Sequence, residues 1–354
     1  MPTALYKIIE NGKYGFIDQT GAIVIEPQYL EAEDFYHGFS RIRFNDKLVP
    51  LDAQGRLLLK HLFNYVGYFE EGLARVQLVS RWGYIDQRGS LAIEVQYEEA
   101  GDFSEGLAAV CLGGRWGYID AQGELLIPCT LERAGSFSQG LAPAARDGRY
   151  GYLDREGQWV IEPAYDLVHP FQDRVAVVLS KDKWGLIDQR GKILLLPQFS
   201  VIEGQGNGEF YEGLAVVVHE ERYGFINQEG DIVVPPKYDF AGDFASGMAL
   251  VELDSRFGYL NQVGALVIAP QYEDAGVFAA GLAPVKTGTQ WGFVDATGEW
   301  RIAPQYDVAF PFREGLAQVV REGRWQYINP AGETIWSEPL ESGNDRPVAF
   351  DLLA

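Results

Sequence analysis

The chain has 354 residues, and its 13% aromatic content together with 41 glycines favours β structure over helix. Its 29 basic and 50 acidic residues give a net charge of −21, which argues against a nucleic-acid partner and leaves basic partner surfaces and cations as candidates. Two cysteines do not make a disulfide framework, and neither a long apolar segment nor a secretory pattern is visible, so we expect a cytoplasmic protein without a membrane span.

One motif, aromatic-Gly-aromatic-aliphatic-Asp/Asn-x-x-Gly, recurs along the chain. Successive copies start 34 residues apart, except for one step of 39 residues. The ten copies start at Tyr14, Leu48, Trp82, Trp116, Tyr150, Trp184, Tyr223, Phe257, Trp291 and Trp325. We therefore predict one continuous array of ten repeats over residues 1–340, a five-residue insertion near residues 201–210, and a C-terminal tail at residues 341–354.

Within a repeat, the motif itself predicts a strand such as WGYID, followed by a tight turn. The Asp or Asn of the motif caps the backbone N–H groups of that turn, and the final Gly takes a positive φ. We predict this structural role for Gly21, Gly89, Gly123, Gly157, Gly191, Gly230, Gly264 and Gly298, and for the same Gly in the two remaining copies.

The rest of the repeat predicts two more strands. An apolar run follows the turn and reaches a Pro, which we expect to end the strand because Pro cannot donate to a ladder. An irregular stretch of about ten residues then leads past a Phe, with room for a short fourth strand. The sequence GLAxV alternates apolar residues at period two and predicts a half-buried strand, joined to the next motif by a polar hairpin turn such as GGR at Gly113.

The units that begin at Trp82, Trp116, Trp184 and Trp291, each followed by an aliphatic-x-Pro-x-aromatic segment or a variant of it, resemble bacterial WG repeats. The resemblance covers roughly residues 5 to 340. It implies an all-β fold of ten 34-residue repeats, and its likeness to choline-binding cell-wall modules implies surface-ligand binding. We expect each repeat to be a short antiparallel meander and the repeats to stack as an open β-solenoid. The alternative is a closed β-propeller, whose blades usually need 40 residues or more.

The aromatic residue before the first Gly of the motif has two interpretations. Trp82, Trp116, Trp184 and Trp291 can form the core between repeats, because Tyr and Phe replace Trp at this position in other copies. They can also line pockets between repeats that hold a cation or a sugar. The insertion offers a second candidate binding region, since function in repeat arrays is found in such insertions. Its candidate residues are Glu203, Asn207 and Phe210.

No pattern in the sequence predicts catalysis, a cofactor or a metal site. The turn carboxylates supply one acidic group per repeat, too few for a calcium site. His37, His61, His169 and His219 lack metal spacing, and Cys111 and Cys129 are expected to be reduced thiols. We therefore expect a non-catalytic binding or scaffolding protein with a protein, peptide or glycan partner. The alternative is a carbohydrate or cell-wall binding module that uses aromatic pockets between repeats.

Overall fold

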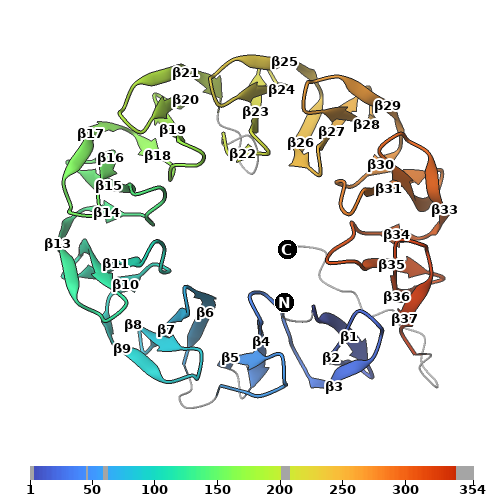
Figure 1. Cartoon of the computed structure of the whole chain (residues 1–354), viewed down its shortest axis with the longest axis horizontal. Coiled ribbons are helices and arrows are strands. Elements are labelled where there is room, and N and C mark those ends of the chain that lie inside the picture. Colours follow the sequence, from blue (N-terminus) through green and yellow to red (C-terminus); the bar gives the residue numbers. More distant parts are fainter. Residues whose placement is uncertain (1–3, 45–46, 59–62, 201–207, 340–354) are drawn as a thin grey trace. The chain divides into compact units, whose positions relative to one another are not determined.

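A computed structural model describes residues 4–44, 47–58, 63–200 and 208–339 (Figure 1). These residues form β-strands and turns, and no helix occurs among them. No helix long and apolar enough to cross a membrane is therefore found in the described ranges. The prediction of an all-β chain built from antiparallel meanders is confirmed.

The described residues form eight four-stranded sheets, one three-stranded sheet and one two-stranded sheet, and no sheet closes on itself. The first sheet contains β1 (Tyr6–Glu10), β2 (Lys13–Ile17) and β3 (Ile23–Tyr29), and the second contains β4 (Phe39–Phe44) and β5 (Lys47–Asp52). The next four are β6 (Tyr65–Glu70), β7 (Leu73–Leu78), β8 (Arg81–Asp86) and β9 (Leu91–Tyr97); β10 (Glu99–Ala100), β11 (Leu107–Leu112), β12 (Arg115–Asp120) and β13 (Leu125–Leu131); β14 (Arg133–Ala134), β15 (Ala142–Arg146), β16 (Arg149–Leu153) and β17 (Trp159–Tyr165); and β18 (Leu167–Val168), β19 (Val175–Ser180), β20 (Lys183–Asp188) and β21 (Ile193–Ser200). The last four are β22 (Phe210–Tyr211), β23 (Leu214–His219), β24 (Arg222–Asn227) and β25 (Ile232–Tyr238); β26 (Phe240–Ala245), β27 (Met248–Leu253), β28 (Arg256–Asn261) and β29 (Leu266–Tyr272); β30 (Asp274–Ala275), β31 (Leu282–Thr287), β32 (Gln290–Asp295) and β33 (Trp300–Tyr306); and β34 (Val308–Ala309), β35 (Ala317–Arg321), β36 (Arg324–Ile328) and β37 (Thr334–Ser337).

Each four-stranded sheet joins parts of two successive sequence repeats. The repeat that starts at Trp82 supplies β8 and β9 to one sheet and β10 and β11 to the next. The short first strand, such as β10, is the fourth strand for which the sequence left room, and it pairs with β11 over two residues. Because every repeat spans two sheets, neighbouring sheets are held together by the chain itself as well as by packing.

The glycine of the WG pair lies where two strands approach most closely. The pairing of β12 with β13 shifts register between Trp116 and Tyr118, which marks a β-bulge. A Cβ atom on Gly117 would lie 2.4 Å from the carbonyl oxygen of Ile127 and 2.8 Å from the nitrogen of Cys129. Every described WG-type glycine meets the same carbonyl position at 2.3–2.6 Å, so any side chain there would force the strands apart.

The motif's second turn has the predicted chemistry. In the turn after β12, Oδ1 of Asp120 accepts hydrogen bonds from the N–H groups of Gln122 (2.9 Å) and Glu124 (2.8 Å), and Gly123 has a φ of +81°. A Cβ on Gly123 would lie 3.3 Å from the side chain of Ile93, which belongs to the preceding sheet. The same glycine-to-aliphatic contact recurs between later sheets, so the turn also fixes how neighbouring sheets stack.

The core lies between successive sheets and is built on the second aromatic of the motif. Tyr84, Tyr118 and Tyr152 are fully buried, and each ring packs against the Phe 19 positions later, with centroids 4.6–4.9 Å apart. Burial raises the pKa of these tyrosines, and the hydroxyl of Tyr118 donates to the carbonyl of Gly135 at 2.8 Å. A buried hydroxyl with a partner avoids a desolvation penalty of about 1–3 kcal/mol.

The predicted end of the third strand at Pro is wrong. β3, β13 and β17 continue through Pro27, Pro128 and Pro163. Each of these strands is the last in its sheet and lies at the edge, so a missing N–H costs no ladder hydrogen bond there. A Pro on an exposed edge also prevents another strand from pairing with it.

The chain divides into two compact units. Unit 1 comprises Met1–Phe35, Glu220–Phe225 and Val233–Ala354, and unit 2 comprises Tyr36–His219 and Ile226–Ile232. In unit 2, the sheets from β6 to β21 follow one another in chain order, with the last strand of each sheet along one side of the row and the first strand along the other (Figure 1).

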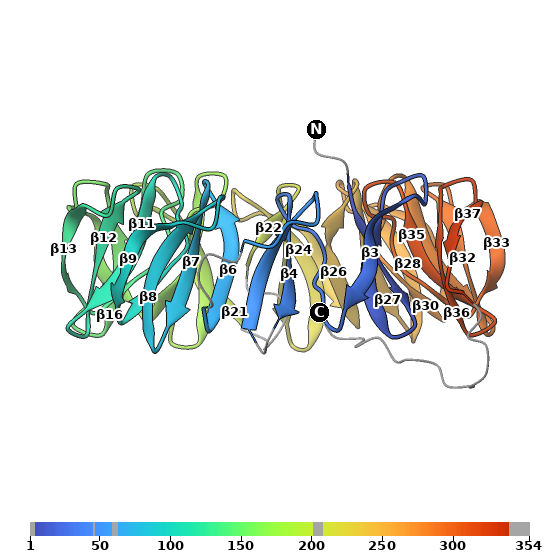
Figure 2. The same cartoon turned by 90° about the horizontal axis from the view of Figure 1, so that it is seen from below.

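In unit 1, the first sheet packs against the last sheet, β34–β37 (Figures 1 and 2). The hydroxyl of Tyr327 donates to the carbonyl of Lys7 at 2.9 Å, and that of Tyr6 donates to the carbonyl of Glu314 at 2.7 Å. A Cβ on Gly21 would meet Ile335, which is the turn-to-strand contact seen between successive sheets. The repeat that starts at Trp325 is therefore covered by the first sheet.

Candidate functional site

In the four sheets from β6 to β21, a two-residue turn leads from the segment of the first strand into the second strand. The turn at Gln139 and Gly140 is closed by reciprocal hydrogen bonds between Ser138 and Leu141, at 2.9 and 3.2 Å. Both turn residues have positive φ, +55° and +82°. Such turns match the right-handed twist of the strands they join, and their second position strongly favours glycine. We call these turns, at residues 71–72, 105–106, 139–140 and 173–174, the turn row.

Side chains link each turn of the row to the next. The carboxylate of Glu71 accepts the N–H of Gly106 at 2.8 Å. The carboxylate of Glu105 accepts the N–H groups of both Gln139 (2.5 Å) and Gly140 (2.9 Å). The amide oxygen of Gln139 in turn accepts the N–H of Arg174 at 2.8 Å. The acceptor that bonds the turn at residues 173–174 is therefore a neutral amide, whereas the acceptors that bond the two preceding turns are carboxylates.

Arg174 departs from the row in a second way. Its φ is +75° at the turn position that Gly38, Gly72, Gly106 and Gly140 occupy in the four preceding turns. Glycine adopts this conformation freely, whereas a residue with a side chain loses about 1–2 kcal/mol. Strain of this kind persists where surrounding structure imposes it, and it is concentrated at functional positions.

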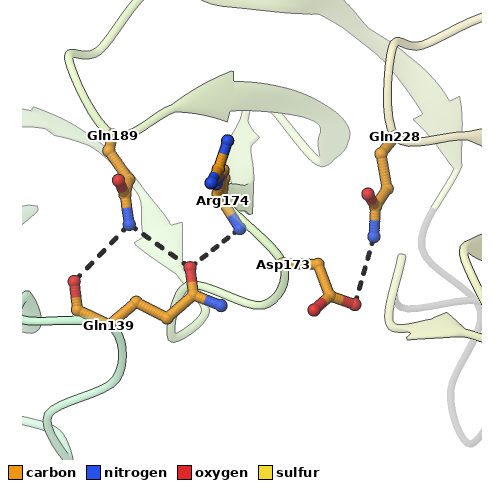
Figure 3. Close-up of a pocket in the computed structure, with 5 residues that line it drawn as sticks. All are labelled: Gln139, Asp173, Arg174, Gln189 and Gln228. Carbon is orange, nitrogen blue, oxygen red and sulfur yellow. Dashed lines mark hydrogen bonds between the residues drawn. The ribbon is translucent and has the colours of Figure 1, made fainter.

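The side chain of Arg174 lies in an open, polar pocket of about 520 Å³ (Figure 3). The other lining residues are Gln139, Asp173, Gln189 and Gln228. Gln189 follows β20, in the sheet that carries the turn at Asp173 and Arg174, and Gln228 follows β24, in the next sheet. Nε2 of Gln189 donates to Oε1 of Gln139 at 3.2 Å, and Nε2 of Gln228 donates to Oδ2 of Asp173 at 3.2 Å.

These contacts fix the pocket walls and leave the guanidinium of Arg174 available. Within the part of the chain that the structure describes, no residue accepts a hydrogen bond from that guanidinium, and the side chain is exposed. The pocket therefore offers a planar cation beside primary amides that can donate and accept. Such a set can bind and orient a polar ligand, and it contains no pair of groups arranged for proton transfer or nucleophilic attack.

A family model described as "WG containing repeat" matches residues 14–47, 51–78, 82–116, 116–150, 150–184, 184–222, 223–256, 257–288 and 291–325. The chain belongs to this WG-repeat family. The nine matched repeats correspond to the first nine predicted copies, and the tenth, from Trp325, lies beyond the last match and forms β36 and β37.

No curated protein matches the WG-repeat chain in sequence. Among solved structures it is similar to a eukaryotic initiation factor, with 10% identity, a TM-score of 0.55 and coverage of 86% of this chain and 95% of that one. It is also similar to the dihydro-heme d1 dehydrogenase NirN in complex with DHE, with 12% identity, a TM-score of 0.41 and coverage of 86% and 73%. At this identity the first likeness describes the fold alone.

The WG tryptophans contribute to the cores between sheets. Trp184 is completely buried in the core beneath β19 to β23, and a Cβ on Gly208 would lie 3.3 Å from its ring. Trp82, Trp116 and Trp291 are half-buried and pack against cores. The structure thus places all four tryptophans at packing positions.

The insertion candidates are only partly described. Glu203 and Asn207 lie outside the described residues. Phe210 is 3% exposed and belongs to the same core as Trp184, and its N–H and carbonyl bond the side chain of Gln172 at 3.0 and 2.7 Å. Phe210 therefore packs like the Phe of the other WG repeats.

Sequence reasoning missed the Arg174 pocket, although the sequence carries a signal for it. Every other copy of this turn has glycine at its second position, and only the copy QDRV, which starts at Gln172, has arginine. The residues that the copies share predict the fold, whereas the signal for the pocket is the position at which one copy departs from the others. A comparison of these turns does not reveal Gln189 and Gln228, because these two residues lie in the turns that follow β20 and β24.

Proposed function

We propose that this WG-repeat chain is a non-catalytic protein that binds another polypeptide through the Arg174 pocket of unit 2. The observation that carries the proposal is an arginine held at a positive φ where glycine would fold at lower cost. Its side chain makes none of the described hydrogen bonds of the fold. An arginine that lowers stability at this position without contributing to the fold points to a role in binding.

The lining of the pocket supports a polypeptide ligand. Amide side chains can satisfy both the N–H and the C=O groups of a peptide main chain, as Gln172 does for Phe210 within this fold. A volume of about 520 Å³ is within the range of ligand sites, and the open mouth admits a segment of chain.

Substituting Arg174 tests the proposal, because binding and stability should change in opposite directions. A random peptide library displayed on phage is selected on the immobilised full chain, and the affinities of the selected peptides are measured for the wild type and for Arg174→Gly. We expect Arg174→Gly to raise the unfolding midpoint and to weaken peptide binding by at least about tenfold. Arg88→Ala, which removes an exposed arginine from the turn after β8, none of whose residues lines the pocket, is the matched control and should change neither.

If the selected peptides bind Arg174→Gly as tightly as the wild type, the pocket is not the binding site. If no peptide is selected in repeated rounds, polypeptide binding itself is rejected.

A second candidate function is the binding of a sugar in unit 1. A pocket of about 360 Å³ lies between the first and last sheets, and the rings of Phe310 and Trp325 stack there with centroids 6.0 Å apart and planes at 23°. Lys7, Asp34 and Gln318 add polar groups to this lining. Aromatic faces beside a few polar groups are typical of small-ligand pockets. A glycan array is probed with the full chain and with Trp325→Ala. We expect the array to retain the wild type and not the variant. An array that retains neither protein rejects this candidate.

A further inference from the structure

Two turns of the turn row, at residues 105–106 and 139–140, bind a carboxylate, and in both the carboxylate comes from a side chain of the preceding turn. Glu105 places both carboxylate oxygens on the consecutive N–H groups of Gln139 and Gly140, at 2.5 and 2.9 Å. Glu71 does the same to Gly106 with one oxygen at 2.8 Å. Successive backbone N–H groups of a turn form a concave partial positive charge that binds anions. The fold thus shows which ligand this turn geometry accepts.

The turn at Asp173 and Arg174 lacks such a carboxylate. Gln139 stands where Glu71 and Glu105 stand in the preceding turns, and its neutral amide oxygen accepts the N–H of Arg174 at 2.8 Å and Nε2 of Gln189 at 3.2 Å. The guanidinium of Arg174 adds a full positive charge at the same turn. The nearest carboxylate of the lining, Asp173, is bound by Gln228 at 3.2 Å and forms no ion pair with Arg174 in the described structure.

We infer that the Arg174 pocket binds a carboxylate carried by the partner, an inference that rests on the proposed binding function. A guanidinium matches a planar carboxylate with two parallel hydrogen bonds, and charge-assisted bonds of this kind are about twice as strong as neutral ones. A singly charged group also meets less repulsion than a phosphate dianion in a chain with a net charge of −21. The carboxylate is either a side chain or a chain terminus of the partner, and both present the same planar group.

Three small probes distinguish these sources. N-acetylglycine carries a terminal carboxylate, the α-amide of N-acetylglutamic acid carries a side-chain carboxylate, and the α-amide of N-acetylglutamine is the neutral match to the second. Each is titrated into the full chain while the NMR signals of the Arg174 guanidinium and the Gln139 side-chain amide are followed. We expect saturable shifts of both signals with at least one carboxylate, and none with the neutral probe.

Gln139→Glu is the decisive variant, because it gives this turn the internal carboxylate that the two preceding turns receive. The substitution introduces the residue found at Glu71 and Glu105, so the fold should be retained with an unfolding midpoint equal to or above that of the wild type. Affinity for the carboxylate probe should fall by at least about tenfold as the internal group competes. Gln122→Glu, at an exposed turn outside the pocket, controls for the added charge.

Equal shifts with the neutral probe, or undiminished carboxylate affinity in Gln139→Glu, would overturn the inference. If selected peptides lose affinity in Arg174→Gly but keep it when their acidic groups are replaced by amides, the pocket binds polypeptides without reading a carboxylate. That result leaves the proposed function in place and rejects only its extension to a charged ligand.

Discussion

At the scale of single residues, two structurally equivalent turns show how one hydroxyl changes a carboxylate. Oδ1 of Asp295 accepts the N–H groups of Thr297 and Glu299, at 2.9 and 3.1 Å, as the capping Asp does throughout the array. The hydroxyl of Thr297 adds a third bond at 2.6 Å. These bonds, the hydroxyl foremost, lower the pKa of Asp295 to about 2. Thr20 does the same for Asp18, whose pKa is also lowered.

We predict that Thr297→Ala raises the pKa of Asp295. In the folded state this pKa lies below the value of about 3.9 for a free Asp, so the turn contributes stability at neutral pH that is lost as the pH falls from about 4 towards 2. Removing the hydroxyl raises the folded-state pKa towards that of a free Asp, so the pH range over which this stability is lost becomes narrower. An NMR titration of the Asp295 carboxyl carbon measures the shift directly, with Thr287→Ala at a strand end as the control. An unchanged titration midpoint in Thr297→Ala would show that the backbone bonds and the ion pair with Arg301 (2.8 Å) set the pKa without the hydroxyl.

At the scale of strands and turns, the pattern of the sequence predicted the meander because each strand and turn carries its own local signal. Period-two alternation in LAAVCL gave β11, and Asp120 with Gly123 gave the turn that follows β12. The passage of β13 through Pro128 was not predictable, because the sequence does not say which strand will be the edge of the sheet. The Arg174 pocket was not predictable either, since its lining comes from four turns that only the folding and stacking of the sheets bring together.

The WG glycine gives a sharp prediction at this scale. Gly117→Ala would place a Cβ 2.4 Å from the carbonyl oxygen of Ile127, so β12 and β13 must separate at the bulge. We expect a loss of about 3 kcal/mol, the upper end for overpacking a core. Gly113→Ala, in the hairpin turn before β12, meets nothing within 4 Å and should lose about 1 kcal/mol through its φ of +63° alone. Urea unfolding of the two variants measures the difference, and equal losses would mean that backbone conformation, not close approach, requires the WG glycine.

At the scale of the whole molecule, the contact between the first and last sheets of unit 1 differs from the other junctions by one substitution, at Tyr6. Each four-stranded sheet has a strand before its central hairpin, whereas the described part of the first sheet starts at β1. Tyr6 occupies the strand position where Ala74, Ala108 and Ala142 stand in later sheets. Its ring packs edge-on against Tyr327 at 5.6 Å, and Tyr327 bonds the backbone of β1 with its hydroxyl. Two tyrosines thus supply packing and hydrogen-bond donors at this junction.

Tyr6→Ala therefore tests how far this junction holds the two terminal sheets together. The backbone of β1 should accept alanine, because the equivalent strands carry alanine at this position. The loss of stability therefore measures the contact between the two sheets and not a defect within β1. Tyr6 is 7% exposed and donates to the carbonyl of Glu314 at 2.7 Å, and removing a buried aromatic ring typically loses about 3–5 kcal/mol. Hydrogen exchange should show faster exchange in β1–β3 and β35–β37, with β10–β17 of unit 2 unchanged. Tyr211→Ala, which truncates a ring that is 40% exposed, is the control for losing a tyrosine. Protection that falls equally in both units would mean that the array unfolds as one cooperative body, and that the junction contributes to global stability without acting as a local fastening.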